Sequence, residues 1–225
     1  MILVTASFIG LYVVATALTG STSASELEYV TCTSVTKLEN QNYLVRLHSH
    51  DVKYGTGSGQ QSVTATHEKD DFNSYWVIKG TKLKPCGRGD PIECNQIVRI
   101  EHLVTKKNLH SHHFTSPLSG NQEISAFGKN GEGDSGDHWK VICSNSFWER
   151  ESAVRLKHVD TEAWLSLSGQ SFGRPISGQM EVIGSTYADS SSYWKVQEGV
   201  FVKPAEIGMG SFVRDASNKI EHTEL

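Results

Sequence analysis

Three stretches of this 225-residue sequence repeat one pattern, and the repetition constrains the fold more than any other feature. Each stretch carries an apolar residue, a second apolar residue nine positions later, a Ser-Gly turn and a Trp. The markers are Leu38, Leu47, Ser58-Gly59 and Trp76 in the first repeat, Ile100, Leu109, Ser119-Gly120 and Trp139 in the second, and Leu156, Leu165, Ser177-Gly178 and Trp194 in the third. Since a unit of about 60 residues is small for a core of its own, we expect the three units to share one core.

Each repeat has the pattern of about four short β-strands. In the second repeat, apolar and polar residues alternate over 97–100, and segments 108–113, 123–127 and 138–143 complete the unit. Three units are too few for a propeller, and a solenoid would need distinct capping repeats. A closed threefold arrangement removes most free sheet edges. The pattern therefore predicts an all-β fold, a β-trefoil built from three repeats.

The repeated apolar residues are the predicted core of this trefoil. We expect the first markers of the three repeats to form one symmetric layer and the second markers to form another. The three repeated Trp residues should pack beside these layers, because a Trp at equivalent positions more often fills a core than binds three ligands.

The two ends of the chain carry targeting patterns. Residues 1–19 contain no charged side chain, and small residues precede a cut after Ala24, so 1–24 is predicted to be a secretory signal peptide. An N-terminal membrane anchor is the alternative, which the short apolar run disfavours. The last residues, His222, Thr223, Glu224 and Leu225, resemble an endoplasmic-reticulum retrieval signal at the end of a tail over 205–225. The ends predict residence in the endoplasmic-reticulum lumen, with a retrieval receptor as one partner and no membrane insertion after cleavage.

The net charge of −4 argues against a sequence-independent nucleic-acid binder, which needs a basic face. We therefore expect no nucleic-acid partner.

Four cysteines can form two disulfides in an oxidising compartment. Cys32 and Cys94 occupy equivalent places, each six residues before the first apolar marker of its repeat. Trefoil geometry favours Cys32–Cys86 and Cys94–Cys143, the same bridge made twice. The rival pairing, Cys86–Cys94 with Cys32–Cys143, stays open at this stage. No Cys-x-x-Cys motif is present, which weighs against a zinc site or a thiol oxidoreductase.

Two histidine pairs, His48 with His50 and His110 with His112, have strand spacing, so each pair should share one face. The third repeat has Ser at these places, which excludes a threefold metal site. The four histidines are candidate ligand-facing positions in the repeat loops, and no metal is expected.

A second cluster, Glu132, Asp134 and Asp137, only partly matches a calcium loop and reads as a solvated acidic loop. The sequence shows no catalytic constellation, so we expect neither an enzyme nor a cofactor.

Several long strings resemble the stromal cell-derived factor 2 family. They lie at 45–52 (Val-Arg-Leu-His-Ser-His-Asp-Val), 57–64 (Gly-Ser-Gly-Gln-Gln-Ser-Val-Thr), 108–123 (Asn-Leu-His-Ser-His-His-Phe-Thr-Ser-Pro-Leu-Ser-Gly-Asn-Gln-Glu), 173–179 (Gly-Arg-Pro-Ile-Ser-Gly-Gln) and 201–204 (Phe-Val-Lys-Pro). The repeat is similar to the MIR motif, which protein O-mannosyltransferases and the inositol trisphosphate and ryanodine receptors also contain. The resemblance implies a trefoil over 29–204, with MIR repeats at approximately 29–84, 91–145 and 148–204.

The resemblance also implies a function. Members of this family are soluble luminal proteins that associate with a luminal J-domain co-chaperone and, through it, with the luminal Hsp70. They help to keep misfolded client proteins soluble in quality control and the unfolded protein response. The trefoil fold leaves a second hypothesis, a lectin-like module that binds glycans or O-mannosyl groups.

Overall fold

The computed structural model describes residues 28–203, which form twelve β-strands and three 3₁₀ helices. The first repeat contains β1 (Val35–Asn40), β2 (Val45–Lys53), β3 (Gln61–Thr66), η2 (Phe72–Ser74) and β4 (Trp76–Gly80). The second contains β5 (Ile97–His102), β6 (Asn108–Thr115), β7 (Gln122–Phe127), η3 (Ser135–Asp137) and β8 (Trp139–Ile142). The third contains β9 (Arg155–His158), β10 (Trp164–Ser171), β11 (Met180–Ser185), η4 (Ser190–Ser192) and β12 (Trp194–Val200). The prediction of four strands in each repeat is confirmed, whereas the three short helices were not predicted.

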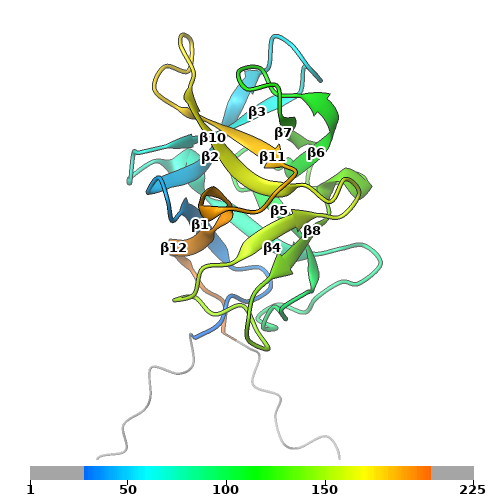
Figure 1. Cartoon of the computed structure of the whole chain (residues 1–225). Helices are drawn as coiled ribbons and strands as arrows, with labels where there is room; N and C mark the ends of the chain where they lie inside the picture. Colours follow the sequence, from blue (N-terminus) through cyan, green and yellow to red (C-terminus); the bar gives the residue numbers. More distant parts are fainter. Residues whose placement is uncertain (1–27, 204–225) are drawn as a thin grey trace, which may run out of the picture.

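The strands form a closed barrel with a three-hairpin cap, the β-trefoil expected from the repeats. Antiparallel pairs join β12, β1, β4, β5, β8 and β9, and a bridge between Val154 and Trp194 closes the ring. The hairpins β2–β3, β6–β7 and β10–β11 pair with one another through β3, β7 and β11. Figure 1 shows the hairpin loops gathered at one end of the molecule and both ends of the described chain at the other.

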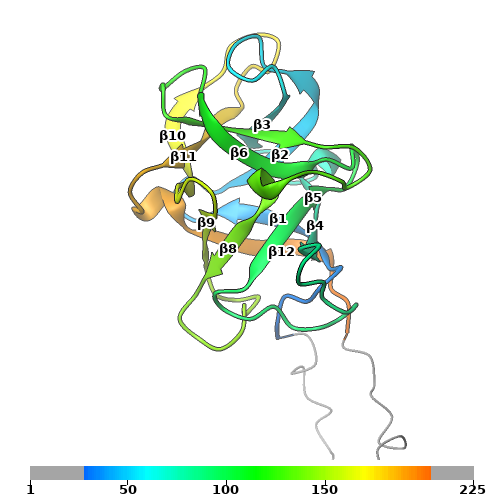
Figure 2. The ribbon, with the colours of Figure 1, turned by 90° about the vertical axis from the view of Figure 1, so that its right-hand side faces the viewer.

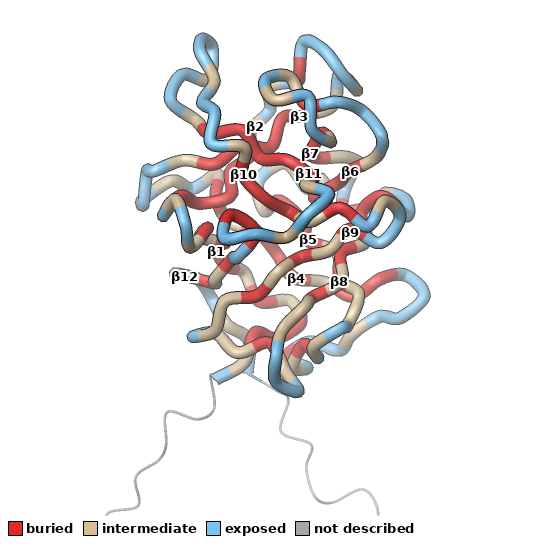
Figure 3. The backbone as a smooth tube through the Cα atoms, viewed as in Figure 1, coloured by how far each residue is buried: buried red, intermediate tan, exposed pale blue. Residues whose placement is uncertain are grey.

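The predicted core residues are confirmed as buried. All six repeated aliphatic markers and the three repeated Trp side chains are fully buried, and they belong to one continuous cluster whose burial Figure 3 shows along the backbone. Each repeated indole donates from Nε1 to the carbonyl of the second apolar marker of its own repeat, at 2.9 Å in all three cases. The same hydrogen bond made three times explains why the Trp recurs at this position.

The disulfides follow the repeat-equivalent pairing, Cys32–Cys86 and Cys94–Cys143. All four cysteines are paired. Because stable disulfides are rare in the reducing cytosol, the pairing indicates a non-cytosolic compartment.

The predicted signal peptide (1–24) and retrieval tail (205–225) lie outside the described residues. Over 28–203, no helix has the length and hydropathy that crossing a membrane requires.

Candidate functional site

A carboxylate-capped 3₁₀ helix precedes the last strand of each repeat. The caps are Asp71, Asp134 and Asp189, and each carboxylate accepts from the backbone N–H two residues later. Such capping is the usual role of Asp at a helix N-terminus. The helices lie beside β2, β6 and β10, the strands that carry the histidine pairs and their serine equivalents.

In the first repeat, a hydrogen-bonded chain runs from Asp71 through His48 to His50. The Asp71 carboxylate accepts from His48 Nδ1 at 2.7 Å, and His48 Nε2 lies 2.7 Å from His50 Nδ1. When the His48 imidazole is neutral, its Nε2 can only accept, so His50 Nδ1 donates to it. Burial would raise the pKa of Asp71, but hydrogen bonds from Ser74 and His48 outweigh it and lower that pKa. Burial and then the neighbouring His48 lower the pKa of His50, which favours its neutral form.

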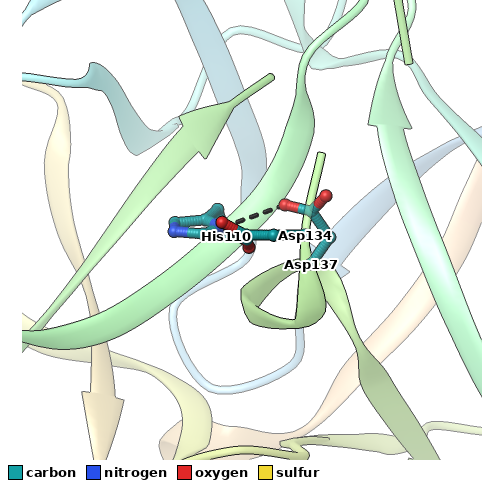
Figure 4. Close-up of side chains that lie close together, drawn as sticks. All are labelled: His110, Asp134 and Asp137. Atoms are coloured by element: carbon teal, nitrogen blue, oxygen red, sulfur yellow. Dashed lines mark hydrogen bonds and ion pairs between the residues drawn. The ribbon is translucent and has the colours of Figure 1, made fainter. Parts of the chain in front are cut away.

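The second repeat places the equivalent histidine against Asp137, as Figure 4 shows. Asp137 Oδ1 accepts from His110 Nδ1 at 2.9 Å, and Oδ2 accepts from Asn108 Nδ2 at 3.0 Å. Asp134 is more distant, with Oδ1 3.7 Å from His110 Nδ1. The prediction of a solvated acidic loop is therefore wrong for Asp137, which is fully buried, although Glu132 and Asp134 are exposed.

The side chains of His110, Asp134 and Asp137 form a set that could hold a metal ion, since their ligand atoms lie within 4.8 Å of one another. The donor set is already engaged, however. Asp137 accepts from two side chains, and Asp134 caps η3 through Gly136 N–H. In the third repeat a different residue of the helix is bonded: the hydroxyl oxygens of Ser166 and Ser191 lie 2.6 Å apart, and neither side chain is a usual metal ligand. We call the hydrogen bond between the residue after the second apolar marker (His48, His110 or Ser166) and the capped helix the clasp; it recurs in every repeat, although its partner differs (Asp71, Asp137 or Ser191).

A second set of hydrogen bonds links each 3₁₀ helix to the next repeat. His102 Nε2 donates to the carbonyl of Asn73, and His158 Nε2 donates to that of Gly136, both at 2.9 Å. Asn40 makes the equivalent bond to Ser191 at 2.6 Å. Burial lowers the pKa of His102 to about 4, so this imidazole is neutral at pH 7.

The four candidate histidines lie on strands β2 and β6, in agreement with their strand spacing, and not in the repeat loops to which they were also assigned. His48 and His110 are buried, while His50 and His112 reach partly into solvent. The two pairs have separate partners, Asp71 for the first and Asp137 for the second. A hollow of about 400 Å³ opens beside His110 and His112, lined also by Gln60 and Asp160. Contact of these histidines with a ligand stays a prediction.

The outer face of the barrel carries a surface that the sequence analysis missed. Trp164 is partly exposed and lies between two hollows of about 540 and 520 Å³, both of which Lys157 and Glu162 also line. Strand alternation contains the signal, because Trp164 precedes Leu165, which points into the core. Trp164 must then point outward.

Comparisons with known proteins agree with the repeats, the trefoil and the core. The model of the MIR domain matches residues 40–187. Stromal cell-derived factor 2 of Homo sapiens is 57% identical over 184 residues, which cover 82% of this chain and 87% of the human protein.

Two solved structures are similar to this chain. A Caenorhabditis elegans protein of unknown function is 53% identical, with a TM-score of 0.76 and coverage of 78% of this chain and 99% of the other. The SDF2-like protein from Arabidopsis thaliana is 40% identical, with a TM-score of 0.77 and coverage of 79% and 99%. With its MIR repeats, its trefoil and this similarity over most of its length, the chain belongs to the stromal cell-derived factor 2 family.

Proposed function

We propose that this protein is a non-enzymatic chaperone accessory of the endoplasmic-reticulum lumen. It binds a luminal J-domain co-chaperone, and with that protein it helps the Hsp70 system to keep misfolded client proteins soluble. The predicted signal peptide and the predicted retrieval tetrapeptide at 222–225 support this compartment, and the two disulfides agree with an oxidising one.

The observation that carries the proposal is a contrast between two groups of side chains: the polar ones are hydrogen-bonded to one another, whereas many apolar ones are exposed. The histidines and carboxylates that could perform chemistry are engaged in hydrogen bonds within the chain. Meanwhile ten large apolar side chains lie exposed in the described part of the chain, among them Leu83, Tyr187, Leu44 and Phe72. Apolar and aromatic side chains contribute most to protein interfaces where they gather in one patch, whereas singly scattered ones are ordinary on a protein surface.

A direct test uses the chain from Ser25 onward, purified under oxidising conditions. A chemically denatured client is diluted into buffer with this protein, with a luminal J-domain protein, or with both, and light scattering follows aggregation. We expect the pair to suppress scattering more than the sum of the separate effects. Absence of any effect, together with no co-purification of the two proteins, would refute the proposal.

The alternative function is a lectin-like module for glycans or O-mannosyl groups. That reading would place an aromatic platform in each repeat, but the three repeated Trp side chains are fully buried and hydrogen-bonded inside the core. A glycan titration run beside the aggregation assay decides between the two. Tight glycan binding by a protein with no J-domain partner would favour the lectin.

A further inference from the structure

The outward face of strands β5, β8, β9 and β10 carries an unusual row of side chains. Ile97 pairs directly with Lys140, Lys140 with Lys157, and Lys157 with Trp164. These four residues occupy neighbouring strands in one register, and Figure 2 shows β5, β8 and β9 side by side. With about 4.8 Å between strands, the row spans roughly 14 Å. We call this row, with its neighbours Ile142 and Arg155, the Trp164 face.

Two lysines directly opposite each other are unfavourable in a sheet. Lys140 and Lys157 are such a pair, and like charges at this spacing destabilise the strands. Only Lys157 has a counter-ion, Glu162 at 3.5 Å, and that carboxylate is largely exposed. Within residues 28–203, neither Lys140 nor Arg155 has a carboxylate at ion-pair distance. Ion pairs within the described residues therefore leave most of this positive charge unneutralised, on a chain whose net charge is −4.

Apolar side chains flank the cations on both sides. Ile97 and Ile142 line the hollow at one end, and the Trp164 ring stands at the other. Arg155 lies 5.0 Å and Lys157 5.5 Å from the centroid of this ring, so the cations and the indole form one stacked unit. Beyond Trp164, the second hollow is also lined by the polar side chains of Asn121 and Thr186.

This arrangement of charged and apolar side chains indicates which class of ligand the Trp164 face could bind. A small inorganic anion would neutralise the lysines but would leave the flanking isoleucines and the indole uncovered. A neutral sugar would cover the indole but would leave the lysines unneutralised. An extended polypeptide with carboxylates between apolar side chains satisfies both requirements along the length of the row.

We propose that the Trp164 face binds an extended segment of a partner protein in which an apolar, an acidic and a second apolar residue stand at every second position, so that all three side chains lie on the face of the segment that meets the row. The inference rests on the proposed function, since it names the surface on which a co-chaperone or a client would dock. The cations pair with the carboxylates of the segment, while Trp164 and the two isoleucines bury its apolar side chains. Tryptophan and arginine are among the residues that contribute most to binding at protein interfaces.

The chain carries its own reporter for a test. Four of its five Trp residues are fully buried, and Trp164 is the partly exposed one. Indole emission therefore reports occupancy of this face. The probe is the acetylated, amidated octapeptide Ser-Leu-Ser-Glu-Ser-Leu-Ser-Glu, whose Leu and Glu side chains share one face of the extended chain, and the comparison peptides have Lys or Gln in place of Glu. We expect the acidic peptide to shift the emission to the blue and to protect it from acrylamide, and the basic peptide to do neither.

The decisive variant is Lys140→Glu, which places a carboxylate opposite Lys157. Loss of the like-charge pair should raise Tm by roughly 1–3 °C, while the acidic peptide should bind roughly tenfold more weakly. A residue with a merely structural role would not raise stability and lower binding together. Lys53→Glu is the matched control, since it makes the same change of charge at an exposed lysine of β2, and it should bind as the wild type does.

Four results would overturn the inference: no binding of the acidic peptide, equal binding by Lys140→Glu, equal binding of the basic peptide, or the same emission shift with heparin or inorganic phosphate. The function proposed above is tested separately by co-purification with the J-domain protein. If Lys140→Glu loses the peptide and keeps that partner, the face binds a client segment. If Lys140→Glu keeps the peptide while the wild type suppresses aggregation, the inference fails and the proposed function stands.

Discussion

Asp137 is the residue whose removal tests the clasp most sharply. Its buried carboxylate accepts from His110 Nδ1 and Asn108 Nδ2, so Asp137→Ala leaves two buried donors without these acceptors. A hydrogen bond to a charged group contributes about 1.5–3 kcal/mol, so the two together give a loss of about 4 kcal/mol. For a domain of this size, 1 kcal/mol corresponds to roughly 2–4 °C in Tm, which predicts a decrease of roughly 8–16 °C.

The assay is thermal unfolding followed by circular dichroism, with urea unfolding as a second measure. Asp134→Ala is the matched control, because this exposed carboxylate caps η3 and lies 3.7 Å from His110 Nδ1 without a hydrogen bond to it, so its loss should cost about 1 kcal/mol. EDTA and divalent cations should leave the Tm of the wild type unchanged. A decrease for Asp137→Ala no larger than for Asp134→Ala would refute the clasp. So would a large rise in Tm with a divalent cation that Asp137→Ala abolishes, since that pattern identifies a metal site.

Four further predictions concern the core, the histidines, the disulfides and the tail. Trp194→Phe removes the indole donor to the Leu165 carbonyl and leaves a cavity, and it should cost about 2–4 kcal/mol in urea unfolding; a loss under about 0.5 kcal/mol would contradict this role. Because burial lowers the pKa of His102 to about 4, the unfolded chain takes up a proton below pH 6.5 that the folded chain does not. Stability should then fall by up to about 3 kcal/mol between pH 6.5 and 4, and His102→Asn should flatten this slope; an unaltered slope would show that other groups cause it. Cys94→Ser opens a loop of 49 residues and should cost about 2–4 kcal/mol, as calorimetry without reductant will show. Deletion of 222–225 should send the protein into the culture medium, whereas unchanged retention would show that a partner holds it in the cell.

The fold was predictable because residue spacing within each repeat indicates its strands and its core positions. Strand alternation set which side chains point inward, and the equal nine-residue interval placed Leu47, Leu109 and Leu165 at equivalent depths. Equivalent positions of Cys32 and Cys94 favoured the pairing that the structure shows, although counting alone left three pairings open. Such inferences succeed because the alternation of side chains along a strand fixes on which face of the sheet each residue lies.

The clasps were not predictable in the same way. Asp134 and Asp137 belong to one acidic loop, yet one is exposed and the other has no exposed surface. Their difference arises from Asn108 and His110 on β6, about thirty positions earlier, which cover Asp137 after the chain has folded. Burial of a carboxylate depends on which donors surround it, and that is a property of the assembled repeats.

The residues alone were sufficient to predict a threefold all-β domain and its core and to favour one pairing of its cysteines, because these follow from periodicity and from symmetry between repeats. Only the tertiary structure decided the charge pattern of the outer face. Ile97, Lys140, Lys157 and Trp164 are scattered over 68 positions of sequence, and the barrel register alone aligns them into one row. Cross-strand neighbours are chosen by pairing between distant segments, and local propensity contains no information about that pairing.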